Sequence, residues 1–203
     1  MTARKEVLAR IRAALRDVPP GEATEAPSRP VPAPRSFSET VELFADRVAD
    51  YRAVVVRCTD TNLATRLTEA VEGCARVLVP TDLQPGLRPT GPVIVEDHLL
   101  AVTDLDAVGA VVTTARLGIA ETGTIVLDHG SGQGRRAATL VPDRHVCIVR
   151  AEQVVATVTD AVAILDPSRP QTWISGPSAT SDIELDRVEG VHGPRTLRVL
   201  LLG

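Results

Sequence analysis

Residues 53–80 read AVVVRCTDTNLATRLTEAVEGCARVLVP, and this stretch decides the fold class. A short β-branched run over 53–56 predicts a strand, the segment 61–71 predicts a helix, and 76–79 predicts a second strand that ends at Pro80. Strands that alternate with helices are typical of a parallel or mixed sheet covered by helices on both faces. We therefore expect a three-layer α/β domain.

The chain on either side of this stretch continues the alternation. A helix is expected over 152–165 and a short one near Ile183. Short apolar or β-branched runs predict further strands, at 93–95, 110–114, 124–127, 146–149, 172–174 and 197–202. The rhythm thus extends to the end of the chain.

Three parts are expected along the chain. Residues 1–16 form an amphipathic helix, since apolar residues recur on one face, and six prolines make 17–35 an extended linker. The compact domain covers 36–203 and opens with the capping-box pair Ser36 and Glu39. The first helix either docks on a partner protein or packs back on its own domain, and the sequence leaves both open.

Composition excludes several classes of function. With 2% aromatic residues and a net charge of −4, a nucleic-acid-binding face is not expected. Lys5 is the one lysine, and it lies far from any glycine-rich loop, so neither a Schiff-base lysine nor a P-loop lysine is expected. The charged start and the absence of an apolar run of about 18 residues favour a cytoplasmic protein with no membrane span.

The cysteines and histidines do not have the spacing of a metal or cluster site. Cys58, Cys74 and Cys147 are odd in number and widely separated, which favours small buried hydrophobic residues over a disulfide framework or an iron–sulfur motif. The four histidines likewise lack metal-ligand spacing. We expect no cofactor and no metal in this chain.

The segment Gly118-Ile-Ala-Glu-Thr-Gly-Thr124 places a carboxylate between two apolar runs. Gly123 permits a tight turn, and the hydroxyls of Thr122 and Thr124 can donate hydrogen bonds. Glu121 is therefore a candidate base, nucleophile or substrate clamp. Alternatively, it caps a turn by accepting backbone N–H bonds, and the residues alone leave both readings open.

Residues 128–136, DHGSGQGRR, have two open interpretations. They can form an anion-binding nest backed by Arg135 and Arg136, or a flexible hairpin loop. The glycine spacing matches neither a dinucleotide-binding loop nor a nucleophile elbow.

Two later segments supply further polar groups. Ser175-Gly-Pro-Ser178 precedes Asp182 and can hold a carboxylate or phosphate on backbone amides, although Ser178 can equally be a helix cap. His192 and Arg195 follow in a loop before the last strand, as a candidate acid or base and a carboxylate clamp.

Together these segments resemble the lactate utilization protein C family. The motifs are Gly118–Thr124, Leu140-Val-Pro142 leading into His145, Ser175–Ser178 with Asp182-Ile-Glu184, and Gly190-Val-His-Gly-Pro-Arg195. The resemblance implies a LUD domain, with the α/β fold of ribose-5-phosphate isomerases and coenzyme A transferases. It also implies a three-component system that oxidises L-lactate to pyruvate, in which the iron–sulfur clusters belong to partners: an iron–sulfur protein, and a larger protein with a LUD domain and iron–sulfur motifs.

Three hypotheses follow. The first is a subunit of this lactate system with a pocket for a small anionic substrate. The second is a stand-alone small-molecule enzyme of the isomerase or acyl/CoA-transfer type, and the third is a non-catalytic assembly subunit. The candidate catalytic residues are Glu121 and His192, and the candidate substrate-binding residues are Thr122, Gly123, Thr124, Ser175, Gly176, Ser178, Asp182 and Arg195.

Overall fold

The structure is a computed structural model that describes residues 3–17, 35–180, 188–189 and 192–203. The chain divides into two units, Met1–Pro34 and Arg35–Gly203, which we describe separately. In the first unit α1 spans Ala3–Ala14, within the predicted range 1–16, and its residues are exposed. Most of the proline-rich linker lies outside the described residues.

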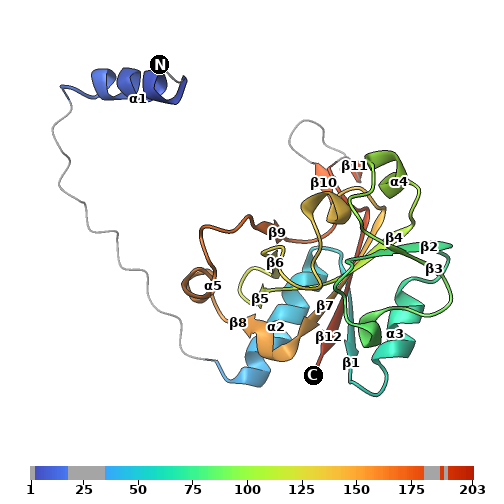
Figure 1. Ribbon diagram of the computed structural model, residues 1–203. Coiled ribbons are helices and arrows are strands. Elements are labelled where there is room, and N and C mark those ends of the chain that lie inside the picture. The colour runs from blue at the N-terminus through green and yellow to red at the C-terminus, as the bar shows by residue number, and fades with distance from the viewer. Residues whose placement is uncertain (1–2, 18–34, 181–187, 190–191) are drawn as a thin grey trace. The chain divides into compact units, whose positions relative to one another are not determined.

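A six-stranded parallel sheet forms the centre of the second unit (Figure 1). Its strand order is β1-β12-β7-β4-β2-β3, and every neighbouring pair is parallel. The strands are β1 (Val54–Cys58), β2 (Arg76–Val79), β3 (Val93–Glu96), β4 (Ala110–Thr114), β7 (Arg144–Arg150) and β12 (Thr196–Leu202). The predicted α/β class is confirmed.

A second, smaller sheet packs beside the first and was not expected from the sequence as a separate layer. Its order is β8-β5-β6-β9, with β6 antiparallel to both of its neighbours. These strands are β5 (Leu117–Ile119), β6 (Thr124–Leu127), β8 (Val154–Val155) and β9 (Thr172–Ile174). A short antiparallel pair, β10 (Ala179–Thr180) and β11 (Val188–Glu189), follows β9.

The helices cover both faces of the parallel sheet. Figure 1 shows α2 (Phe37–Asp50) and α3 (Leu63–Ala70) on opposite sides of β1 and β12. Alternate residues of β7 supply the two cores, since Cys147 packs with α2 and the small sheet, whereas Val146 packs with α3. A third cluster joins α4 (Val102–Asp106) to the sheet.

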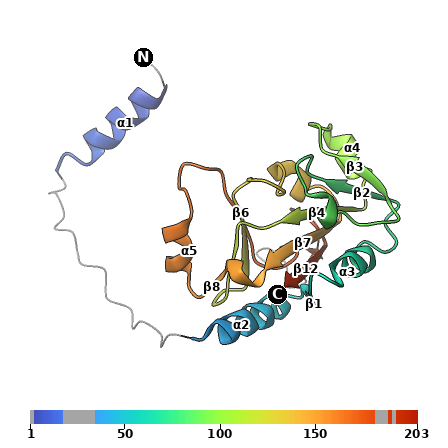
Figure 2. The same ribbon diagram turned by 60° about the horizontal axis from the view of Figure 1, so that its bottom comes forward.

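The small sheet has its own outer cover. Leu117, Ile119 and Val126 pack with Ala161 of α5 (Val158–Ile164), and Figure 2 shows α5 on the side of this sheet away from β7 and β12. The order of layers is therefore α3, parallel sheet, α2 with the small sheet, and α5. None of the helices in the described ranges is long and apolar enough to cross a bilayer.

Local signals set the helix boundaries. Ser36 and Glu39 form the predicted capping box of α2. The helix expected over 152–165 is wrong in its first half, because 154–155 pair with β5 as β8, and a Thr157–Asp160 capping box starts α5 only at 158. Short 3₁₀ helices occur at Pro85–Leu87, Arg136–Thr139 and Ala151–Gln153. The helix expected near Ile183 lies outside the described residues.

Candidate functional site

Two hollows lie at opposite ends of the parallel strands. The first, which we call the amino-edge cavity, has a volume of about 230 Å³ and lies where β7 and β12 begin. Four of the predicted site residues line it, Ser175, Gly176, Ser178 and His192. Its other lining residues are Arg136, Thr139, Leu140, His145, Thr172, Trp173, Ile174, Pro177, Gly193, Pro194 and Leu197.

His145 is a lining residue that was not among the predicted site residues. It is 1% exposed, and its Nε2 atom lies 2.8 Å from the Thr113 hydroxyl oxygen. Burial lowers the pKa of His145 to about 4, so the imidazole is neutral near pH 7. The sequence feature that could have identified His145 is its position as a polar residue directly before the apolar run 146–149. Arg136 is an exposed cation at the same cavity, whereas the sequence predicts that it backs the loop 128–136.

A chain of hydroxyl groups joins two of the predicted motifs. The Thr122 and Thr124 hydroxyl oxygens are 2.8 Å apart, and that of Thr124 is 2.8 Å from the Ser175 hydroxyl oxygen. The Ser178 hydroxyl accepts the backbone N–H of His192 at 3.2 Å, so this serine fixes the loop that carries the histidine. The structure therefore brings together hydroxyl groups that are 51 residues apart in sequence.

Glu121 lies apart from the amino-edge cavity. Its carboxylate accepts the backbone N–H of Val158 at 2.9 Å and caps the start of α5. This is the kind of capping contact that the sequence left open, whereas a base or nucleophile role for Glu121 stays a prediction.

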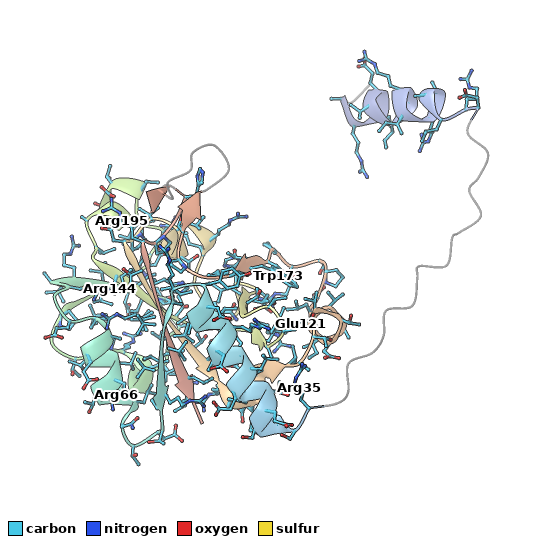
Figure 3. The ribbon with its side chains drawn as sticks, turned by 180° about the vertical axis from the view of Figure 1, so that it is seen from behind. Arg35, Arg66, Glu121, Arg144, Trp173 and Arg195 are labelled. Carbon is cyan, nitrogen blue, oxygen red and sulfur yellow. The ribbon has the colours of Figure 1, made fainter. Side chains whose placement is uncertain are left out.

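Arg195 also lies outside the lining of this cavity. It is 64% exposed at the side chain and is 3.6 Å from the Asp143 carboxylate. Figure 3 shows Glu121 and Arg195 in separate parts of the domain. Asp182 lies outside the described residues.

The glycines of the motifs are required by packing on α2. Gly123 has φ +59°, and a Cβ there would be 2.6 Å from the Arg47 carbonyl carbon. Gly176 has φ +85°, and a Cβ there would be 2.6 Å from the Cβ of Tyr51. Both positions therefore need glycine for its backbone conformation and for the close approach of the helix end.

The second hollow, the carboxyl-edge pocket, has a volume of about 510 Å³. It lies where β4 and β7 end, the edge at which open α/β sheets bind ligands. Its charged lining residues are Arg116, Asp128, Arg150, Asp166 and Arg169. The remaining lining residues are Gln84, Leu87, Thr114, Ala115, Gly130, Ser131, Gln133, Gln153 and Ile164.

The glycine-rich loop 128–136 forms one wall of the carboxyl-edge pocket. The Asp128 carboxylate accepts the backbone N–H of Gly130 at 3.1 Å and the Gln133 amide at 2.9 Å. The anion held by this loop is thus its own aspartate. Arg135 donates instead to Asp97 at 2.8 Å, and Arg136 lines the amino-edge cavity, so these two arginines do not back a nest.

Cys58 and Cys147 are buried core residues, whereas Cys74 is partly buried. Burial raises the pKa of the Cys147 thiol to about 12, and the Cys58 thiol donates to the Leu201 carbonyl oxygen at 3.6 Å. Over the described ranges, no three histidine, cysteine, aspartate or glutamate side chains are grouped as a metal site. The expectation that this chain carries no cofactor stays a prediction.

Comparison with known proteins gives consistent results. Residues 103–202 match the family model of the LUD domain. A lactate utilization protein C of Deinococcus radiodurans is 45% identical over 182 residues, covering 87% of this chain and 86% of that protein. A lactate utilization protein C of Bacillus subtilis is 34% identical over 91 residues, covering 41% of this chain and 38% of that protein.

A solved structure is also similar. The crystal structure of a DUF162 family protein from Deinococcus radiodurans superposes with a TM-score of 0.73 at 36% sequence identity. The match covers 84% of this chain and all of that chain.

Proposed function

The chain belongs to the lactate utilization protein C family, and from this membership we propose that it is a component of a bacterial lactate utilization system. The observation that carries the proposal is the 45% identity to a protein of that name, because it extends over 87% of this chain. The similarity thus includes more than the 100 residues of the LUD match, 103–202.

We further propose that this system oxidises L-lactate to pyruvate and that iron–sulfur proteins are its electron-carrying partners. The support is the family resemblance of the motifs. Two of the three thiols, those of Cys58 and Cys147, are buried in the core, and burial keeps the Cys147 thiol protonated. This placement is consistent with clusters carried by partner proteins.

We propose the amino-edge cavity as the site for the small anionic substrate. Its volume of about 230 Å³ fits a three-carbon acid more closely than the volume of about 510 Å³ of the carboxyl-edge pocket does. The Arg136 guanidinium can pair with a carboxylate, and the hydroxyls of Ser175 and Ser178 can bond its oxygens. His192 is exposed at the same cavity, where it can act on a substrate proton.

Growth on L-lactate tests the proposal. The gene is deleted from the native host, and plasmids supply the wild-type chain or a variant. We expect the deletion strain to lose growth on L-lactate and the wild-type chain to restore it. Growth of the deletion strain at the parental rate would contradict a role in lactate utilization.

Two variants of the same chain locate the site. Arg136→Gln removes the exposed cation of the amino-edge cavity. The control is Arg76→Gln, because Arg76 is an exposed arginine at the start of β2 that lines neither hollow. We expect Arg136→Gln to fail in restoring growth and Arg76→Gln to succeed. If both variants restored growth to the wild-type rate, Arg136 would be excluded from the site, while the role in lactate utilization would stand.

The assembly alternative makes a different prediction. If the N-terminal helix recruits partner proteins, deletion of residues 1–35 abolishes complex formation while Arg136→Gln leaves growth intact. A pocket-centred function predicts the opposite pattern.

A further inference from the structure

The carboxyl-edge pocket takes no part in the function proposed above, and its chemistry differs from that of the amino-edge cavity. Three arginines line it, whereas a single arginine lines the other hollow. Two aspartates, Asp128 and Asp166, partly offset this charge. Hydrogen bonds from Ser168 lower the pKa of Asp166, so it is ionised at neutral pH. The lining therefore has an excess of one positive charge.

Arg116 and Arg169 lie near Asp128, but this carboxylate does not use up their hydrogen-bond donors. The Nε atoms of Arg116 and Arg169 are 3.8 Å and 3.6 Å from the Asp128 carboxylate, while the other oxygen of this group is bonded by the loop. Both distances exceed that of a hydrogen bond. The Arg169 Nε atom donates instead to the Asp128 carbonyl oxygen at 3.3 Å, and the other guanidinium donors of the two arginines remain available. Asp128 thus positions the two cations and leaves them able to bind another anion.

Arg150 adds a third guanidinium at the end of β7. Its side chain is exposed and lines the pocket. Its backbone N–H donates to Gln153 at 2.9 Å, and Gln153 in turn bonds the Ala115 carbonyl oxygen at 3.0 Å. The backbone beneath the arginine is therefore anchored to the segment that follows β4.

The rest of the lining indicates the size and kind of ligand. A volume of about 510 Å³ leaves room well beyond one phosphate or carboxylate group. Ser131 and Gln84 are exposed at the pocket and can bond hydroxyl groups. The lining residues described here include no aromatic side chain, so a stacked nucleobase has no platform.

We propose that the carboxyl-edge pocket binds a phosphate ester of a small polyhydroxy compound. Arg116, Arg150 and Arg169 hold the phosphate, since planar guanidinium groups match its oxygens in paired hydrogen bonds and a dianion balances several cations. The uncharged end of the ligand lies toward Gln84 and Ser131. This site is independent of the lactate role, because it shares no lining residue with the amino-edge cavity.

Isothermal titration of the full chain at constant ionic strength tests the proposal. The probes are glucose 6-phosphate, inorganic phosphate, gluconate and glucose, which separate the phosphate from a carboxylate and from the sugar. We expect saturable binding of both phosphate probes, with glucose 6-phosphate the tighter, and much weaker binding of gluconate and glucose. Absence of binding by both phosphate probes, or gluconate binding as tightly as glucose 6-phosphate, would overturn the proposal.

Variants locate the binding. Arg150→Gln and Arg169→Gln should each weaken phosphate binding by about tenfold or more, and Arg150→Lys by less, because it keeps the charge without the paired geometry. The matched control Arg76→Gln should bind as the wild type does. Equal weakening by the control, or unchanged binding by both arginine variants, would place the phosphate elsewhere. Circular dichroism checks that each variant is folded.

Discussion

The two hollows lie at opposite ends of the same parallel strands, and the chain builds them in different ways. Two segments that are nearly continuous in sequence, 172–178 and 192–197, supply most of the lining of the amino-edge cavity. In the carboxyl-edge pocket each arginine comes from a separate segment, at 116, 150 and 169. Residues that are neighbours in sequence form a visible motif, whereas residues that topology alone brings together do not.

The largest expected effect concerns the packing of the small sheet beside the amino-edge cavity. Gly123→Ala should lower the free energy of unfolding by about 3 kcal/mol, because the new Cβ meets the backbone of Arg47 in a left-handed conformation. Gly86→Ala is the matched control, since its Cβ would meet nothing within 4 Å. Urea unfolding measures both. Equal effects would mean that the motif glycine is not needed for packing.

Acidification should destabilise the domain through His145, which lines the amino-edge cavity. The folded pKa of His145 is about 4, against 6.5 for the free side chain, so the unfolded chain binds the extra proton between these values. Stability should therefore fall as the pH drops from about 6.5 towards 4, by about 3 kcal/mol in total. Urea unfolding between pH 7 and pH 5 samples the upper part of this window.

The control for this prediction is a histidine on the surface. His145→Gln should remove the histidine part of the slope, whereas His98→Gln, at a side chain 71% exposed, should retain it. The same pH dependence in all three proteins would show that the slope has another source.

Asp128→Asn should make the carboxyl-edge pocket more positive and so increase its difference in charge from the amino-edge cavity. Loss of the carboxylate leaves Arg116 and Arg169 less compensated, so phosphate should bind more tightly. The loop should keep an oxygen acceptor for Gln133, and stability should fall by only about 1–2 kcal/mol. Titration with inorganic phosphate and urea unfolding measure the two effects. Weaker phosphate binding by a folded variant would contradict this electrostatic account.

The smallest expected effect is that of Glu121→Gln. The amide can still accept the Val158 N–H, so only the charge at the helix start is lost, which is worth about 0.5 kcal/mol. The capping contact predicts growth on L-lactate at the wild-type rate. Loss of growth with unchanged unfolding would instead support the catalytic role that the sequence suggested.

Local patterns made much of the fold predictable. The strands predicted at 76–79, 110–114, 124–127 and 172–174 are observed with the same bounds, and the Ser36 capping box starts α2 as expected. The small sheet was not foreseen, because β5 has three residues and β8 has two, too few for a pattern to be recognised. Their pairing is determined by tertiary packing and not by the local sequence.

The site was less predictable for the same reason. The Ser175 to Ser178 segment and His192 were found from local motifs, and the structure brings them to one cavity. By contrast, the Val158 N–H that Glu121 accepts is 37 residues away, and Arg135 pairs with an aspartate 38 residues away. Such partners are set by topology and leave no signal in a single sequence.

The most direct test of the account is to isolate the tagged chain from its native host grown on L-lactate. The eluate is assayed for bound iron and for lactate-dependent reduction of an artificial electron acceptor. The account predicts that iron and this activity co-purify with the chain and that pyruvate is formed. A chain that elutes alone, without iron or lactate-dependent activity, would contradict it.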